Sequence, residues 1–481
     1  MKRLAMFRLL AIIIGGITFL MFPSLVMALI LGEASMIRAF LLPMGAGLVL
    51  ILPAVLFLRG SSLGIRPRDG FLLVFLTWVF ASIAGSIPYF LSPLNLRFSD
   101  AIFESACGFA TTGATTFGDV EILPKSLLLW RSMSHWAGGM GIILLTVALL
   151  PLLGVGGFQL IKAETPGPEK EKLTPRVTAS AKILWGAYCI FTVTLALLYR
   201  FGGMDWFDSV CHSFSIMATG GVSTKNAGFG FYNSSFIDWV TVIFMLIGAF
   251  NFNMYFRLVR KKFRDLADNT ECRVYLSIFI IASALISISL IPQYGSFREA
   301  LRFGAFQAAS ILSTTGNARV NYTVWPGMAQ GILLGLMLVG GCSGSTAGGI
   351  KVIRWTVLFK QAGNEMRRIL YPKGVFSIQL NKKVGRKDVV YGVAGFVFLY
   401  FSLIAITTLV TAAAGYDVFS SFSAAVSITG NVGASFGTVG SNSYYGEFPG
   451  YLKLFYSLVM ITGRLELWTV LVLFTREYWK H

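Results

Sequence analysis

The sequence predicts an all-α polytopic membrane protein, with two N-terminal helices followed by four pseudo-symmetric helix–pore loop–helix repeats around a central pore. Three observations support this fold class. The chain of 481 residues is 55% hydrophobic and 13% charged, with a mean hydropathy of +0.70, which is far too apolar for a soluble globular domain. Its basic residues gather in alternate connections between uncharged runs. A short segment rich in glycine and threonine recurs four times.

The basic residues indicate the topology of the chain in the membrane. Of the 40 Lys and Arg residues, 29 fall in six connections, at residues 2–8, 59–68, 162–182, 257–273, 351–387 and 476–480. Such a bias is typical of loops that remain on the cytoplasmic side. The net charge of +18 therefore sets topology and does not indicate a nucleic-acid partner. We expect a multi-pass protein of the cytoplasmic (inner) membrane, surrounded by lipid, with both termini in the cytoplasm.

Ten apolar runs are candidate membrane spans. They cover residues 9–32, 39–58, 70–96, 132–161, 183–199, 239–256, 274–297, 320–350, 389–416 and 454–474. Most reach the roughly 20 residues that a helix needs to cross a hydrocarbon core of about 30 Å. The basic start of the first run resembles a signal peptide, but its uncharged stretch continues for 24 residues, so we interpret it as a retained span.

The chain carries no pattern that indicates an enzyme or a metal site. Its five cysteines have no C-x-x-C spacing and are expected to be packing residues: Cys107, Cys189, Cys211, Cys272 and Cys342. His135 and His212 lie in apolar or short-helix contexts, where a packing or hydrogen-bonding role is more common than a ligand role. No nucleophile motif or paired carboxylates occur within the apolar runs. We therefore expect neither catalysis nor a cofactor in this chain.

After the two N-terminal helices (1–69), one unit recurs four times. Its copies are repeat 1 (70–161), repeat 2 (181–262), repeat 3 (263–387) and repeat 4 (388–481), with a cytoplasmic linker at 162–180. Each repeat contains a short segment ending in "ATTGAT", "ATGGVS", "STTGNA" or "GNVGAS", which aligns Gly113, Gly221, Gly316 and Gly433. The segments before the glycines support this register, because Asp205 and Asp417 each lie 16 residues upstream.

Four such segments favour a pore. A helix of about 11 residues is ~17 Å long, so it enters the bilayer without crossing it. Non-helical backbone at that depth is tolerated only where it is buried in protein or lines a watery cavity. Glycine lets carbonyl oxygens turn toward an axis, and threonine adds hydroxyls, which together predict a cation selectivity filter. The alternative is that small residues only allow close helix packing.

Further motifs give the chain a family resemblance. They are "HWAGGMGI" (135–142), "KAETPGPEKEKLTPR" (162–176), "GGCSGSTAGGIKVIR" (340–354) and "GRLELWTVLVLF" (463–474). With the four glycine segments, they resemble the Trk/Ktr/HKT superfamily of potassium transporters, and specifically the Trk-type membrane subunit. The resemblance covers essentially the whole chain.

This resemblance implies a potassium filter, with potassium as the substrate. Its residues would be four triplets: Thr111, Thr112 and Gly113; Thr219, Gly220 and Gly221; Thr314, Thr315 and Gly316; Asn431, Val432 and Gly433. Relatives usually have Ala before the third glycine and Phe after it, whereas Thr315 and Asn317 stand here. Ala434 stands where Trk-type relatives often have Pro. These departures bear on the preference for potassium over sodium.

The run at 320–350 is interrupted by small residues that break a helix and leave a flexible loop. We call residues 340–349 the small-residue loop: Gly340, Gly341, Cys342, Ser343, Gly344, Ser345, Thr346, Ala347, Gly348 and Gly349. The alternative is a helix packed through small-xxx-small contacts. In the family this position is an intramembrane gate. Arg464 lies inside the last span, where a charge is costly unless it faces a cavity or a partner, and the resemblance implies that it projects into the pore near the gate.

The resemblance also implies partners and a transport activity. Trk-type subunits imply a homodimer bound to a cytoplasmic ring of nucleotide-binding regulatory subunits, docked on the basic loops. We expect potassium uptake through a fixed filter. One alternative is an obligate cation-coupled potassium symporter with alternating access, or a sodium-permeable variant, and the other is an intramembrane enzyme. Four similar loops favour a fixed filter over inverted repeats.

Overall fold

The computed structural model describes residues 2–56, 67–141, 177–259, 268–381, 383–384, 387–440 and 444–480. Their regular secondary structure is helical apart from one antiparallel ladder, in which β1 (Gln379–Leu380) pairs with β2 (Lys383–Val384). The predicted all-α class is confirmed. Most of the linker at 162–180 and the motif at 162–176 lie outside the described residues.

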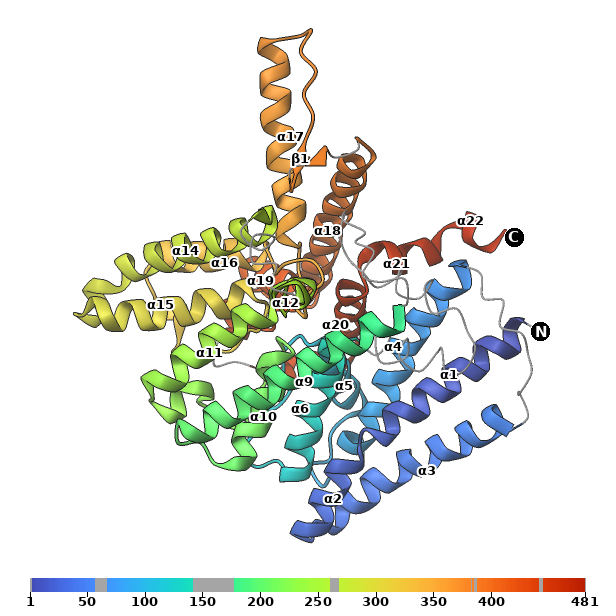
Figure 1. Cartoon of the computed structure of the whole chain (residues 1–481). Coiled ribbons are helices and arrows are strands. Elements are labelled where there is room, and N and C mark those ends of the chain that lie inside the picture. The colour runs from blue at the N-terminus through green and yellow to red at the C-terminus, as the bar shows by residue number, and fades with distance from the viewer. Residues whose placement is uncertain are drawn as a thin grey trace.

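The N-terminal region forms a helical layer against the rest of the molecule (Figure 1). It consists of α1 (Lys2–Phe19), α2 (Phe22–Leu31) and α3 (Ala34–Leu56). α1 and α2 together form a span at Met6–Leu31, so the basic start leads directly into a membrane helix. α1 packs against α3 and α4.

Four long helices open the four repeats. They are α4 (Pro67–Phe90), α9 (Val177–Phe201), α14 (Thr270–Tyr294) and α18 (Lys387–Ala413). Each is long and apolar enough to cross a membrane. Their outward faces remain apolar, and Phe398 on α18 is 71% exposed while Ile280 on α14 is 62% exposed. Such faces fit contact with lipid, and the chain is a multi-pass membrane protein.

Each long helix is followed by a short one that packs in the interior. The short helices are α5 (Phe98–Ala110), α10 (Trp206–Met217), α15 (Phe297–Leu312) and α19 (Val418–Gly430). Asp205 and Asp417 start two of them, because each carboxylate accepts a hydrogen bond from the backbone N–H three residues later. The aspartates that establish the register in the sequence are therefore helix caps. In α5, every residue from Ser99 to Ala110 is buried.

The second helix of each repeat is shorter than the sequence predicts. These helices are α6 (Lys125–Gly139), α11 (Ser235–Gly248), α16 (Gly327–Met337) and α20 (Gly450–Arg464). Between the short and second helices lie η2 (Gly228–Tyr232), η3 (Tyr322–Val324), η4 (Gly437–Val439) and η5 (Tyr445–Glu447). The chain continues beyond the breaks as α12 (Phe252–Val259), α17 (Val352–Leu370), α21 (Leu467–Leu471), η6 (Val472–Phe474) and α22 (Arg476–Trp479).

The expectation of a continuous span is therefore wrong for the second helices of repeats 1, 2 and 4, whereas the break in repeat 3 was expected from its small residues. Within the described residues, six helices are long and apolar enough to cross, and a seventh candidate is the pair α20 and α21–η6, which bends by 114°. Glu466 has a φ of 62° at that bend. These breaks could not be predicted from hydropathy, because an apolar segment can be buried in the membrane protein whether or not it is one continuous helix.

Two features lie outside this bundle of helices. α17 and the β1 strand project away from it at the top of Figure 1. The N- and C-termini lie on the same side of the molecule in that view.

Candidate functional site

The four triplets share an unusual backbone conformation. Their first residues, Thr111, Thr219, Thr314 and Asn431, have φ of 53°, 54°, 56° and 54°. The glycines that end the triplets have φ of 78°, 76°, 76° and 81°, and the middle residues do not have positive φ. A β-branched threonine at positive φ is a rare and strained conformation, and such strain concentrates at functional sites. It is Gly433, and not Gly430, that has positive φ.

The same hydrogen bond anchors every triplet to its short helix. In each, the backbone N–H of the middle residue donates to the carbonyl oxygen six positions before the glycine. The pairs are Thr112 to Cys107 at 3.0 Å, Gly220 to Ser215 at 2.8 Å, Thr315 to Ser310 at 2.8 Å and Val432 to Ser427 at 2.9 Å. Four segments that are distant in the sequence are thus locally equivalent.

The glycines bring the four triplets together in one closed ring. A Cβ atom on each glycine would collide with the carbonyl oxygen of the middle residue in the next triplet. The pairs are Gly113 with Gly220, Gly221 with Thr315, Gly316 with Val432, and Gly433 with Thr112. The contacts run from repeat 1 through repeats 2 and 3 to repeat 4 and back to repeat 1. No side chain fits at these glycines without displacing a neighbouring carbonyl.

This ring has the chemistry of a cation site. Alternation between positive and negative φ can turn successive carbonyl oxygens toward the same side of a strand. Asn431 links two neighbouring strands, because its Nδ2 donates to the Thr112 hydroxyl at 3.0 Å. Backbone carbonyl and hydroxyl oxygens are suitable ligands for a cation that has lost its water shell.

The small-residue loop lies directly against the triplets. Residues 338–351 contain no helix, which excludes the alternative of a continuous helix packed through small residues. The Thr219 hydroxyl donates to the Thr346 carbonyl at 2.9 Å. The Gly348 N–H donates to the Thr314 hydroxyl at 2.7 Å. The loop therefore contacts the ring on the side of the first triplet residues.

Two neighbours anchor this loop from repeats 2 and 3. The N–H of Cys342 donates to the Ala249 carbonyl at 2.9 Å, next to the end of α11. The N–H and hydroxyl of Ser343 donate to the Glu271 carboxylate on α14, at 2.6 and 2.9 Å. Glu271 is 5% exposed, so its interaction with Ser343 is shielded from water.

Arg464 bridges the loop to repeat 1. Its guanidinium donates to the Thr346 carbonyl at 2.6 Å and to the carbonyls of Gly138 and Gly139 at 2.9 Å each. These carbonyls come from the loop and from the end of α6, two segments that are far apart in the sequence. The arginine, which belongs to repeat 4, therefore connects the loop to repeat 1.

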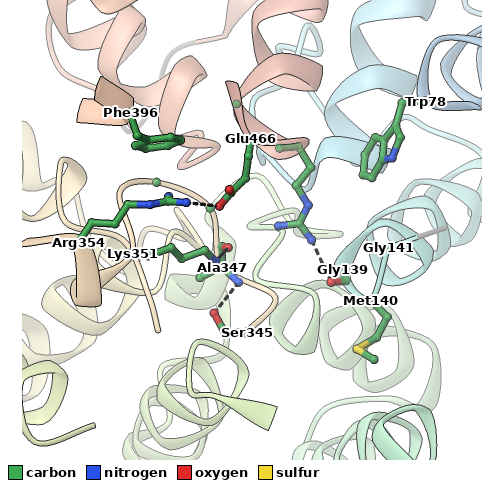
Figure 2. Close-up of a pocket in the computed structure, with 14 residues that line it drawn as sticks. Trp78, Gly139, Met140, Gly141, Ser345, Ala347, Lys351, Arg354, Phe396 and Glu466 are labelled. Carbon is green, nitrogen blue, oxygen red and sulfur yellow. Dashed lines mark hydrogen bonds and ion pairs between the residues drawn. The ribbon is translucent and has the colours of Figure 1, made fainter. Parts of the chain in front are cut away.

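A cavity of about 100 Å³ is lined in part by Ser345 and Ala347 of the loop (Figure 2). Lys351 lines it and donates from Nζ to the Ala347 carbonyl at 2.6 Å. Arg354 pairs with Glu466 at 2.5 Å and stacks on the Phe396 ring, with its guanidinium carbon 3.7 Å from the ring centre. With Arg464, the cavity has three basic side chains and one acidic side chain among the described residues. A cation that enters it meets a net positive charge.

Four charged residues beside this cavity and loop were not predicted from the sequence: Glu271, Lys351, Arg354 and Glu466. Lys351 and Arg354 were grouped with the cytoplasmic basic connection, but each is 5% exposed and faces the cavity. The signal that was available is their position, because "GGIKVIR" places both directly after the small residues, with no polar linker between them. Glu271 and Glu466 carried no such signal, since each is recognised only by its partner.

Both histidines pack within this assembly. His212 hydrogen-bonds through Nδ1 to the Asp208 carbonyl at 2.8 Å and through Nε2 to the Ser223 hydroxyl at 3.0 Å. His135 is 1% exposed and lies against Gly220, where a Cβ atom would collide with its ring. Within the described residues, no group of His, Cys, Asp or Glu is placed to hold a metal ion.

Known proteins are similar to this chain in sequence and in fold. The sequence profile of TrkH, described as a cation transport protein, matches residues 45–480. The chain belongs to the TrkH family. The TrkH potassium uptake protein of the Trk system in Halomonas elongata is 36% identical over 483 residues, covering 98% of both chains. The corresponding TrkH of Escherichia coli K12 is 38% identical over 423 residues, covering 86% of this chain and 87% of the relative.

A solved TrkH structure has the same fold. The crystal structure of the potassium transporter TrkH from Vibrio parahaemolyticus superimposes with a TM-score of 0.88 at 31% identity, and the match covers 100% of both chains. The resemblance to a Trk-type membrane subunit, inferred from the triplets and motifs, is confirmed.

Proposed function

We propose that this TrkH-family chain conducts potassium into the cell across the cytoplasmic membrane, through the ring of four triplets. The closed ring is the observation that carries the proposal, because each glycine packs against a carbonyl of the next triplet. The relatives are named as potassium uptake proteins of the Trk system, which supports potassium as the substrate.

In this proposal the twelve triplet residues form the selectivity filter. Carbonyl oxygens replace the water shell of potassium, and threonine hydroxyls add further oxygen ligands. The C-terminal ends of α5, α10, α15 and α19 lead into the triplets. The negative ends of these helix dipoles favour a cation at the ring. The pseudo-symmetric arrangement of four repeats around a central pore is part of the same proposal.

The small-residue loop and Arg464 act as the gate in this mechanism. The contacts of the loop at 340–349 with the first residues of two triplets support this role. The basic side chains of the cavity add an electrostatic barrier behind it. Opening requires the loop to leave its bonds with Arg464, Glu271 and Lys351, so the proposal predicts a gate that a cytoplasmic partner can release.

The orientation and partners follow the same family pattern. We assign both termini to the cytoplasm, as supported by the basic connections and by the position of both ends on one side in Figure 1. We also propose a homodimer that binds a ring of nucleotide-binding regulatory subunits. The sequence has no G-x-G-x-x-G after a strand, so nucleotide sensing belongs to that separate protein.

Single-channel recording tests this function against the alternating-access symporter. Purified protein in a planar bilayer, with potassium on one side and sodium on the other, should show unitary currents that favour potassium. Rescue of a potassium-uptake-deficient bacterium at low external potassium should accompany them. Tightly coupled transport without unitary currents would instead support a symporter, and currents without a preference for potassium would support a sodium-permeable variant.

A further inference from the structure

One position behind the ring is occupied by a small polar residue in all four repeats. Six residues before the glycine stand Cys107, Ser215, Ser310 and Ser427. All four are buried, with exposed fractions of at most 1%. Their backbone carbonyls accept the equivalent hydrogen bonds from the middle triplet residues described above. The backbone hydrogen bonds at this position are the same in all four repeats, so any difference between the repeats here must come from the side chains.

The side chains divide the repeats into two pairs. In repeat 1, the Cys107 thiol donates to the Ala114 carbonyl at 2.9 Å. In repeat 3, the Ser310 hydroxyl donates to the Asn317 carbonyl at 2.6 Å. Both acceptors belong to the residue directly after the triplet glycine. In these two strands a single position on the short helix therefore binds the chain on both sides of the glycine.

Repeats 2 and 4 lack this second bond. Ser215 and Ser427 are 0% exposed, yet neither hydroxyl donates to the carbonyl of Val222 or Ala434, all four of which the structure describes. The glycine contacts run in the order 1, 2, 3, 4, so repeats 1 and 3 face each other across the ring. The restrained strands are thus opposite, and the unrestrained strands occupy the other two sides.

This pattern determines which oxygens reach the pore axis beyond the glycines. A carbonyl that accepts a hydrogen bond from the short helix behind it points away from the axis. The oxygens of Ala114 and Asn317 are therefore withdrawn from any ring of ligands at that level. Two opposite strands are also stiffened, and stiff strands resist closing around an ion smaller than potassium.

We propose that Cys107 and Ser310 are positioning residues for ion preference, which restrain two opposite carbonyls outside the outer end of the filter. The inference rests on the proposed filter function. It assigns a role to a cysteine that sequence reasoning treated as a packing residue. It also predicts that the four positions are not functionally equivalent, although they share one register and one backbone hydrogen bond.

The test is the potassium-to-sodium permeability ratio of the full chain in planar bilayers, measured from bi-ionic reversal potentials. Cys107→Ala and Ser310→Ala should each lower the ratio by about fivefold, the change expected for loss of one neutral hydrogen bond. Ser215→Ala and Ser427→Ala are matched controls, because they remove the same group at the same register without breaking such a bond. Both controls should stay within about twofold of wild type.

Volume-conserving swaps keep the test decisive if an alanine variant does not fold. A hydroxyl is a stronger donor than a thiol. Cys107→Ser should therefore raise the ratio, and Ser310→Cys should lower it. Equal effects in all four repeats, or no effect of Cys107→Ala and Ser310→Ala in folded protein, would overturn the inference. A wild-type chain with no preference for potassium would instead overturn the proposed function itself.

Discussion

The ring of triplets and the small-residue loop beside it are held by different kinds of interaction. We call the loop together with the charged residues that bind it the closure. In the ring, four segments repeat the same φ values and the same backbone hydrogen bonds. In the closure, charged side chains bridge segments that do not repeat. Arg464 binds loop and α6 carbonyls, Glu271 binds Ser343, and Arg354 pairs with Glu466.

The ring is therefore held by backbone interactions, whereas the loop is also held by side-chain contacts. The ring is held by backbone hydrogen bonds, and its glycines leave no room for a Cβ atom. The closure depends on a few side-chain contacts, each of which can be broken without unfolding a helix. We therefore expect substitutions in the ring to change which ion passes, and substitutions in the closure to change how often any ion passes.

Deletion of the loop should have the largest effect. Removing residues 342–347 shortens the loop and eliminates its contact with Thr219, so basal rubidium uptake into proteoliposomes with the membrane subunit alone should rise at least ~20-fold. The deletion should not change the potassium-to-sodium ratio, because the ring remains. If a correctly inserted deletion variant takes up no more rubidium than wild type, the loop is not the gate.

Arg464→Ala should raise basal uptake strongly but less than the deletion. A unit charge about 10 Å from a cation, at an effective dielectric constant near 20, opposes it by about 1.7 kcal/mol, or roughly 15- to 20-fold in rate. The variant also loses the bonds to Thr346, Gly138 and Gly139. Arg464→Lys separates the two causes, since it keeps the charge and loses the planar fork. Uptake by Arg464→Lys close to that of the alanine variant would show that the bonds matter more than the charge.

The glycines should govern selectivity, and their packing predicts a rank. Gly113→Ser places a Cβ atom 2.6 Å from the Gly220 carbonyl oxygen, and the other three glycines are tighter. We expect Gly113→Ser to lower the potassium-to-sodium ratio by about tenfold while the protein still folds, and Gly316→Ser to lower it at least as much. Bi-ionic reversal potentials measure both. A wild-type ratio in Gly113→Ser would show that repeat 1 does not contribute this glycine to the filter.

Glu271→Gln should have the smallest effect. The amide keeps the shape of the carboxylate but replaces charge-assisted hydrogen bonds to Ser343 with neutral ones, a difference of about 1 kcal/mol. Basal rubidium uptake should rise by roughly fivefold, with an unchanged potassium-to-sodium ratio. Ser345→Ala is a control within the loop, because among the residues that the structure describes the Ser345 hydroxyl bonds only within the loop, to the Cys342 carbonyl and the Ala347 N–H. Equal effects of the two variants would remove Glu271 from the closure.

The ring could be anticipated from the sequence because its chemistry is local. Glycine is required where φ is positive and a neighbouring carbonyl is close, and Gly113, Gly221, Gly316 and Gly433 satisfy both conditions. Asp205 and Asp417 indicated the register because each caps the start of a short helix, and each lies 16 residues before the triplet glycine of its repeat. The small-residue loop was also recognisable, since no helix is stable through so many glycines.

The sequence by itself therefore determined the membrane class, the register of the four triplets and the position of the helix-breaking loop, because each depends on composition or on residues that are close in the chain. Only the tertiary structure decided the breaks in the second helices of repeats 1, 2 and 4, the burial of Lys351 and Arg354, and the contacts of Arg464 with Gly138 and Thr346. Those features depend on which distant segments meet around one axis. Hydropathy and spacing do not predict contacts between distant segments, since a buried charge is stabilised by its partners in space and not by its neighbours in the chain.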